Sequence, residues 1–426
     1  MFIHVVKTGE SLFTISQMYG VPSAKIISDN GLTNPDRLVI GQALVIMTNA
    51  VRYTIKRGDS LYSISRMFGV PVADILRANP QITSPSRIYP GEVITVPSPA
   101  KKLGTILVNG YAFTNINRVV LDSVLPYLTY LSLFSYQVRS DGSLIPINDT
   151  VLIAAARAAK VAPMMVITNI EEGGGFSSDL AHDILTNPQV QNTLINNILA
   201  TLQSKNYYGL DIDFEYIFPE DRDDYNNFLR KVVARLRPLG YTVVTALAPK
   251  TSANQAGLLY EAHDYPVHGA LADHVILMTY EWGFTFGPPM AVAPINEVRK
   301  VLNYAVTAIP RQKILMGMPN YGYDWTLPFV RGSAARTVSN IGAVELAARE
   351  GVPIQYDNTA QAPFFNYTDS AGKRHIVWFD DARSIQARLR LVNEYGLGGV
   401  SYWTINRAFP QNWLVLSSMY NIKKVI

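Results

Sequence analysis

Three acidic side chains alternate along the segment YYGLDIDFEY, residues 207–216: Asp211, Asp213 and Glu215. Alternate side chains of a β-strand point to the same face, so successive carboxyl groups would be spaced roughly 7 Å apart along one surface. Buried carboxyl groups at such spacing cannot all ionise cheaply, and at least one should keep a proton near neutral pH. General acid catalysis requires a retained proton of this kind, and we expect Glu215 to hold it.

An antiparallel strand with one wet face would show the same alternation, but the surrounding chain favours a barrel. From residue 104 onward, apolar segments rich in β-branched residues alternate with helical segments, at 105–113, 128–138, 162–170, 208–216, 242–249, 274–282, 313–323 and 398–406. This pattern predicts an α/β fold, a (β/α)8 TIM barrel over residues 104–426. The three acids would then point inward, with Glu215 nearest the carboxyl end, where the active sites of such barrels lie.

The barrel domain is longer than the roughly 250 residues of a typical barrel. The surplus lies between the seventh and eighth strands, at about 325–380, where DSAGK reads as a hairpin turn between two apolar stretches. We therefore predict a small α+β insertion that forms one wall of a cleft.

The first hundred residues contain an internal repeat. HVVKTGESLFTISQMYGVPSAKIISDN, residues 4–30, aligns with YTIKRGDSLYSISRMFGVPVADILRAN, residues 53–79, at an offset of 49. Each unit reads as strand, helix, helix, strand, with Ser11 or Ser60 capping the first helix and Gly20 or Gly69 ending it. We place the two βααβ units at 1–48 and 51–98, followed by a short linker at 99–103.

These repeats resemble LysM domains, which bind polymers that contain N-acetylglucosamine, such as peptidoglycan and chitin. The resemblance implies that KTGESL and KRGDSL, with the loop before each last strand, form a shallow sugar groove. The residues it assigns to glycan binding are Gly9, Ser11, Leu12, Gly58, Asp59, Ser60 and Leu61. A pair of structural repeats without a ligand is the alternative. Two weak sites in tandem would hold the chain on a repetitive polymer by effective concentration.

Residues 208–215 resemble the Asp-x-x-Asp-x-Asp-x-Glu signature of glycoside hydrolase family 18, the chitinase-like enzymes. Other family motifs match GGG at 173–175, MTYE at 278–281, GMPNYG at 317–322 and GGVSYW at 398–403. The chain departs from the family pattern twice. Tyr208 stands where the first Asp is common, and Glu281 follows Tyr280 where Asp is usual.

The resemblance implies retaining, substrate-assisted hydrolysis rather than the usual scheme with two protein carboxylates. Glu215 would protonate the glycosidic oxygen, while the substrate's 2-acetamido group attacks the anomeric carbon and forms an oxazolinium ion. Asp213 would orient the acetamido group, with Asp211 sharing its proton or charge. Tyr280 would hydrogen-bond the acetamido oxygen, and Trp403 would form the floor under that sugar.

Several further residues are candidates for substrate contacts. We assign Glu281, Met278, Tyr111 and Tyr321 to substrate binding. Sugar rings stack on aromatic side chains, so Tyr111, Tyr321, Phe113, Trp325 and Trp378 are all candidates to line the cleft, and core packing is an equal alternative for each of them. His263, His268 and His274 lack the spacing of metal ligands, so we expect them to be structural and expect neither a metal nor a cofactor.

Composition argues against several other functions. The formal net charge of the 426 residues is only +4, without the basic stripe of a nucleic-acid-binding protein. No run of about 18 apolar residues predicts a membrane span. The absence of cysteine excludes disulfides and cysteine-based zinc sites. We expect a monomer whose partner is peptidoglycan or another N-acetylglucosamine polymer.

The start MFIHVVKTGESLF lacks the cationic and apolar regions of a signal peptide. Paired LysM units before a family 18 barrel, without such a signal, resemble the spore cortex-lytic N-acetylglucosaminidases. That resemblance implies hydrolysis of cortex peptidoglycan or its fragments during germination, by an enzyme associated with the spore coat or cortex. The alternatives are a chitinase or other endo-β-N-acetylglucosaminidase and a non-catalytic wall-binding coat protein. Barrels of this family that become lectins usually lose the final acid, and Glu215 is present.

Overall fold

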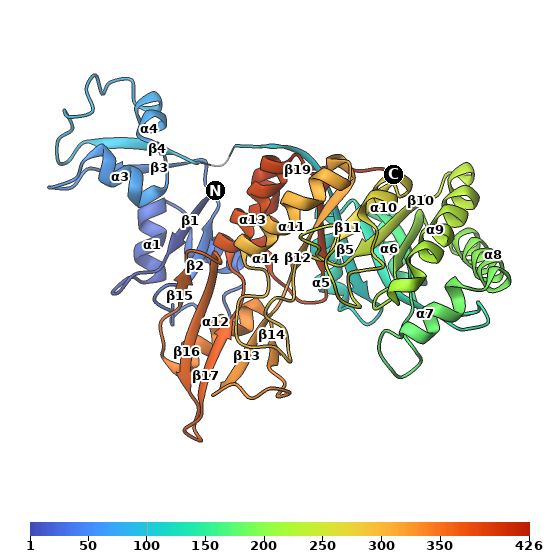
Figure 1. Ribbon diagram of the computed structural model, residues 1–426. Helices are drawn as coiled ribbons and strands as arrows, with labels where there is room; N and C mark the ends of the chain where they lie inside the picture. Colours follow the sequence, from blue (N-terminus) through green and yellow to red (C-terminus); the bar gives the residue numbers. More distant parts are fainter. Residues whose placement is uncertain (100) are drawn as a thin grey trace.

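A closed barrel of parallel strands forms the right-hand part of the molecule in Figure 1. The computed structural model describes residues 1–99 and 101–426; Ala100, within the predicted linker 99–103, lies outside the described residues. The barrel strands are β5 (Gly104–Phe113), β6 (Tyr130–Val138), β8 (Ala162–Thr168), β9 (Gly209–Asp213), β10 (Thr242–Leu247), β11 (His274–Leu277), β12 (Ile314–Pro319) and β18 (Gly399–Trp403). Each pairs in parallel with the next, and β5 pairs with both β6 and β18, which closes the barrel. The predicted TIM barrel is confirmed.

Helices cover the outside of the barrel (Figure 1). They are α5 (Arg118–Val124), α6 (Thr150–Ala158), α7 (Ser178–Leu185), α8 (Pro188–Lys205), α9 (Arg222–Leu236), α10 (Tyr265–Leu271), α11 (Ile295–Ala308), α13 (Ala382–Tyr395) and α14 (Pro410–Met419). Leu210, Ile212 and Phe214 lie in the apolar core between strands and helices. The alternate residues of β9 therefore point into the barrel. Short strands β7 (Leu144–Ile145) and β19 (Tyr420–Ile422) pair with β6 and β5. No helix in the described part of the chain has the length and apolar character to cross a bilayer.

An antiparallel sheet is inserted between β12 and α13. Its order is β14-β13-β17-β16-β15, and α12 lies between β14 and β15 in the chain. The bounds are β13 (Gly322–Leu327), β14 (Arg336–Val338), α12 (Asn340–Glu350), β15 (Gln355–Asp357), β16 (Ala362–Thr368) and β17 (Arg374–Trp378). The turn predicted at DSAGK joins β16 to β17, where the Asp369 N–H donates to the Lys373 carbonyl. The predicted α+β insertion is thus present.

Both repeats have the predicted strand, helix, helix, strand order. The first contains β1 (Phe2–Val5), α1 (Leu12–Tyr19), α2 (Ser23–Asn30) and β2 (Ala43–Ile46); the second contains β3 (Ala50–Thr54), α3 (Leu61–Phe68), α4 (Val72–Ala78) and β4 (Val93–Pro97). Ser11 and Ser60 each form a capping box. Gly20 and Gly69 end α1 and α3 in the left-handed conformation, each with a φ of 64°.

The two repeats share one apolar core, which differs from the barrel core. The rings of Phe2 and Tyr19, from the first repeat, lie 6.1 and 5.8 Å from the ring of Phe68 in the second. Such edge-to-face contacts stabilise packing beyond the apolar area they bury. The repeats therefore pack together as a pair.

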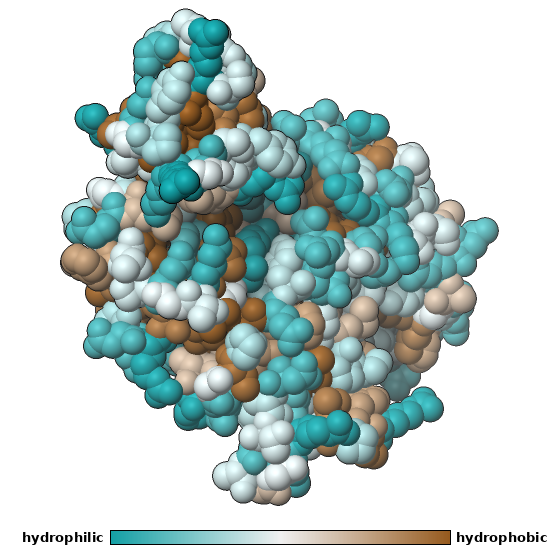
Figure 2. Space-filling view, turned by 90° about the vertical axis from the view of Figure 1, so that its left-hand side faces the viewer, coloured by the Kyte–Doolittle hydropathy of each residue, from teal (hydrophilic) through white to brown (hydrophobic). Residues whose placement is uncertain are grey.

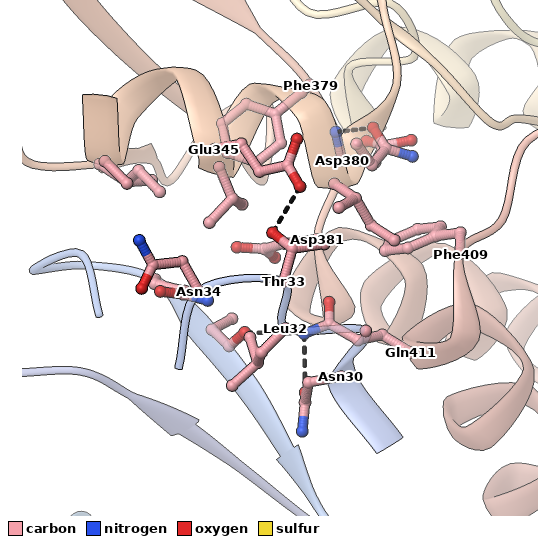
Figure 3. Close-up of a pocket in the computed structure, with 18 of the residues that line it drawn as sticks. Asn30, Leu32, Thr33, Asn34, Glu345, Phe379, Asp380, Asp381, Phe409 and Gln411 are labelled. Carbon is pink, nitrogen blue, oxygen red and sulfur yellow. Dashed lines mark hydrogen bonds between the residues drawn. The ribbon is translucent and has the colours of Figure 1, made fainter. Parts of the chain in front are cut away.

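The first repeat also docks on the barrel domain and its insertion (Figure 3). Gln411, in α14, donates from Nε2 to the Asn30 side-chain oxygen at 2.8 Å and to the Ala43 carbonyl at 2.9 Å. Thr33 donates to Glu345, in α12, at 2.6 Å. A small cavity of about 60 Å³ lies between these partners.

The loop before the last strand distinguishes the two repeats. In the first repeat, Val39 is buried in the core of the insertion, and the Ile354 N–H donates to the Ile40 carbonyl at 2.9 Å. Gly41 has a φ of +86°, and a Cβ there would lie 1.8 Å from the Ile354 oxygen. In the second repeat, Tyr89 corresponds to Val39 and is 59% exposed. The loop before the last strand is therefore buried against the insertion in the first repeat, whereas the equivalent loop of the second repeat is exposed.

Candidate active site

A cavity of about 490 Å³ opens at the carboxyl ends of the barrel strands. Among the residues predicted from the sequence, those that line it are Tyr111, Asp213, Glu215, Met278, Tyr280, Glu281 and Trp403. Asp211 lies deeper in the barrel, and Tyr321 lies behind Glu281, to which it donates a hydrogen bond. The structure thus gathers the predicted catalytic and sugar-contacting residues of the barrel in one place.

The three acids descend from the mouth of the barrel into its interior. Strand β9 ends at Asp213, two residues before Glu215, so Glu215 stands just beyond the ladder. Glu215 is half-buried, Asp213 is 4% exposed and Asp211 is fully buried. This order places the predicted acid where a polymer can reach it.

Burial is the main cause of the raised pKa of each acid. It raises the pKa of Asp211 to about 6, although the nearby Tyr111 hydroxyl and the hydrogen bond from Ser132 oppose this rise. Burial, followed by the charges of Glu215 and Asp211, holds the pKa of Asp213 well above its usual range. Burial and then the charge of Glu281 raise the pKa of Glu215 to about 7. At neutral pH the cluster therefore retains protons, as a general acid requires.

Two residues that the sequence analysis did not assign to catalysis fix the backbone of Glu215. Asn169, fully buried after β8, accepts from the Glu215 N–H at 2.9 Å and donates to the Glu215 carbonyl at 2.8 Å. His263 donates from Nε2 to the Phe214 carbonyl at 2.9 Å, while its Nδ1 accepts from the Ala248 N–H. Burial lowers the pKa of His263 to about 4, so the ring is neutral and can make both bonds.

A chain of polar side chains crosses the barrel at the level of Asp211. The Ser132 hydroxyl lies 3.0 Å from both the Asp211 carboxylate and the Asn109 side-chain oxygen. Asn109 in turn donates to Ser401 at 3.0 Å. These residues belong to β6, β9, β5 and β18, and they give Asp211 a fixed position inside the barrel.

Glu281 sits at the mouth with two tyrosine partners. The Tyr321 hydroxyl donates to its carboxylate, and the Tyr323 hydroxyl lies 3.1 and 3.3 Å from its two oxygens. Burial raises the pKa of Glu281, against these hydrogen bonds. Burial and the neighbouring acids keep the pKa of Tyr280 well above its usual range, so its hydroxyl remains a donor.

Trp403 ends β18 and is surrounded by aromatic edges. The ring centres of Phe134, Tyr111 and Phe113 lie 4.8, 5.4 and 5.8 Å away, at steep angles to the indole. These contacts fix the orientation of the indole and leave it half-buried at the cavity wall. A fixed aromatic plane suits stacking of a sugar ring.

The remaining predicted aromatic and histidine residues lie elsewhere. Trp325 is buried and donates to the Gly287 carbonyl at 2.9 Å, and Trp378 stacks on Phe364 within the insertion. His268 is fully buried and His274 contacts Tyr130. Among the described residues, no group of histidine and acidic side chains is arranged to hold a metal ion.

Residues assigned to the LysM grooves occupy turns at the start of α1 and α3. Gly9 and Gly58 have φ values of 81° and 91°, and Ser11 and Ser60 cap the helices. Leu61 is buried, and its counterpart Leu12 is half-buried. Asp59 points back to its own turn, where it accepts from the Tyr53 hydroxyl and the Lys56 N–H.

Comparison with known proteins defines the class. Residues 99–408 match the family model "Glycosyl hydrolases family 18", and residues 4–46 and 53–97 match the LysM domain. The chain therefore belongs to glycosyl hydrolase family 18, is a glycoside hydrolase, and carries two LysM domains.

Its similarity to individual proteins extends over the full length. It is 45% identical over 432 residues to the cortical fragment-lytic enzyme of Bacillus cereus, covering 99% of each chain. It is 44% identical to the Bacillus subtilis protein of the same description, covering 100% of this chain and 99% of the relative. The crystal structure of the Bacillus megaterium QM B1551 spore cortex-lytic enzyme SleL superposes with a TM-score of 0.87 at 43% identity, over 100% and 99% of the two chains.

Proposed function

We propose that this enzyme is an N-acetylglucosaminidase that cleaves spore cortex peptidoglycan or its fragments during germination. The proposal rests on one observation above all: a half-buried glutamate with a raised pKa stands over two buried aspartates at the mouth of the barrel. Full-length similarity to cortical fragment-lytic enzymes supports the choice of polymer.

The chemistry is substrate-assisted. Glu215 donates its proton to the glycosidic oxygen while the 2-acetamido oxygen of the sugar attacks the anomeric carbon, which breaks the glycosidic bond and forms an oxazolinium ion. Asp213 accepts a hydrogen bond from the acetamido N–H and offsets the positive charge, with Asp211 below it. Glu215, now ionised, takes a proton from water, and the water opens the oxazolinium with net retention.

The other cavity residues position that sugar. The Tyr280 hydroxyl donates to the acetamido oxygen, which aims this oxygen at the anomeric carbon. Trp403 lies under the sugar ring, while Tyr111, Met278 and Glu281 contact its edges. Tyr321 acts through Glu281, which it holds in place by a hydrogen bond.

The LysM repeats hold the enzyme on the glycan polymer, and the site of action is the spore. Retention on the polymer raises the local concentration of cleavable bonds at the barrel.

The test is mass spectrometry of products from purified cortex fragments and from chitin oligomers. The parent enzyme should release products that end in N-acetylglucosamine from cortex fragments. Glu215→Gln should lower kcat by about 10²–10⁴-fold, because the amide cannot donate the proton. Its binding to cortex should not change. Undiminished hydrolysis by Glu215→Gln would refute the assigned role, and products from chitin alone would identify a chitinase.

A further inference from the structure

A groove larger than the catalytic cavity lies between the two LysM repeats and helix α13. Its volume is about 820 Å³. Residues of β1 and α1 line it from the first repeat, and residues of β3 and α3 line it from the second, with Gln386 and Arg390 from α13. Figure 2 shows this side of the molecule, where one lobe stands above a recess and hydrophilic residues are frequent.

The groove is basic. The positively charged side chains that line it are Lys7, Arg52, Lys56, Arg66 and Arg390. No aspartate or glutamate is among its described lining residues, and no ion pair within the described part of the chain involves any of these five side chains. The whole chain has a net charge of only +4, so this is a local concentration of charge.

The acids of the adjoining turns, Glu10 and Asp59, do not line the groove but accept hydrogen bonds from residues that do. Glu10 accepts from His4 Nε2 at 2.9 Å and from the Lys7 N–H at 2.8 Å. Asp59 accepts from the Tyr53 hydroxyl at 2.7 Å and from the Lys56 N–H at 2.8 Å. Each acid is therefore held in place by two hydrogen bonds, and neither forms an ion pair with a lysine or arginine side chain of the groove within the described part of the chain.

Like charges around a concave surface reinforce one another's field and attract an anion. Arginine and lysine bind carboxylates through charge-assisted hydrogen bonds, which are stronger than neutral ones. Apolar side chains of Met18, Tyr19, Met67 and Phe68 also line the groove and offer contact for the uncharged part of a ligand. The combination fits a glycan that carries carboxylates on its side groups.

We propose that the groove between the repeats binds the carboxylates of a peptide-bearing glycan, and so directs the enzyme to peptidoglycan rather than to chitin. Peptidoglycan carries lactyl-linked peptides with free carboxylates, whereas chitin is uncharged. This inference rests on the proposed function and specifies its polymer. The groove adjoins the segments KTGESL and KRGDSL, to which sugar binding was assigned, because Lys7 and Lys56 at their start line it. The turns at Gly9–Leu12 and Gly58–Leu61 do not line it.

The test measures co-sedimentation of the full chain with three polymers: native peptidoglycan sacculi, the same sacculi with carboxyl groups converted to neutral amides, and chitin. All variants carry Glu215→Gln so that the polymers stay intact. Arg52→Gln with Arg66→Gln removes two charges from the groove. Lys25→Gln with Arg77→Gln removes two charges from α2 and α4, outside the groove, where each side chain forms only a surface ion pair.

The groove variant should bind native sacculi at least about fivefold more weakly, as loss of two charge-assisted contacts implies. Its binding to neutralised sacculi and chitin should be unchanged, and the control should stay within about twofold of the parent. Equal losses for both variants, or no effect of neutralisation, would overturn the inference, as would equally tight binding to duplex DNA. Thermal melting checks that both variants fold. Hydrolysis of soluble cortex fragments with Glu215 restored tests the proposed function separately.

Discussion

Glu215 owes its properties to residues far from it in the chain. The placement of Glu215 on the same face as Asp211 and Asp213 was predictable, because the two-residue period of a strand can be read from consecutive residues. The contact with Asn169 spans 46 positions, and His263 reaches the neighbouring Phe214 across 49. Nothing in local sequence tells which loop residue will cross to the end of β9. A buried asparagine directly after a barrel strand is the one signal that could have indicated a positioning role.

The first prediction at this scale concerns pH. In the proposed mechanism Glu215 acts as an acid when protonated, so kcat/KM should fall as the pH rises through its pKa of about 7. The charge of Glu281 helps to raise that pKa. Glu281→Gln should therefore move the alkaline limb of the pH–rate profile to lower pH.

The matched control is Glu220→Gln, an exposed acid that follows the same strand. It should leave the profile in place. An alkaline limb that stays where it is in Glu281→Gln, or moves upward, would contradict the electrostatic account.

At the scale of elements, the sequence located all eight barrel strands but extended several too far. The segment predicted at 208–216 forms a strand only over Gly209–Asp213, and that at 274–282 only over His274–Leu277. In both segments, apolar and aromatic residues continue after the last strand hydrogen bond, because the chain there lines the cavity. The sequence pattern therefore extends the predicted strand beyond its observed end. Tyr216 and Glu281 adopt positive φ values of 55° and 68° just past these ends, a backbone turn that residue type does not reveal.

The docking of the first repeat on the insertion could not be predicted from the sequence either. Val39 and Tyr89 occupy equivalent positions in two similar repeats, and nothing in the sequence marks one of them as a contact. A pair of glycines tests the docking. Gly41 and Gly91 both have positive φ, but only Gly41 lies against the Ile354 carbonyl. Alanine at either position should cost about 1 kcal/mol through backbone strain.

Gly41→Ala should cost more than Gly91→Ala, because the clash forces the first repeat away from the insertion. Thermal melting and limited proteolysis near residues 99–103 provide the readouts. We expect a lower Tm and faster cleavage for Gly41→Ala alone. Identical behaviour of the two variants would show that the contact contributes nothing to the association of the domains.

Burial of the acids lowers the free energy of unfolding of the whole molecule at neutral and alkaline pH. Burial raises the pKa of Asp211 from 3.8 to about 6, so ionising it in the folded protein costs on the order of 3 kcal/mol. The folded state binds this proton more tightly than the unfolded chain does. The protonated carboxyl therefore stabilises the fold below pH 4, and this stabilisation is lost as the pH rises through about 6.

Asp211→Asn should consequently be more stable than the parent at pH 8, by up to about 3 kcal/mol, and similar to it at pH 4. Chemical denaturation at the two pH values measures the difference. Asp36→Asn, in an exposed turn, is the control and should show no such dependence. A less stable Asp211→Asn at pH 8 would mean that the contact with Ser132 outweighs the cost of burial.

The whole molecule combines two LysM domains with a family 18 barrel, which we propose cleaves beside an N-acetyl group. Its central chemical claim is that the substrate supplies its own nucleophile. The direct measurement compares two aryl disaccharides that differ only at the sugar carrying the leaving group, one with a 2-acetamido group and one with a 2-hydroxyl. The account predicts that the hydroxyl substrate reacts at least about 10³-fold more slowly, because its internal nucleophile is missing. Comparable rates for the two substrates would contradict it.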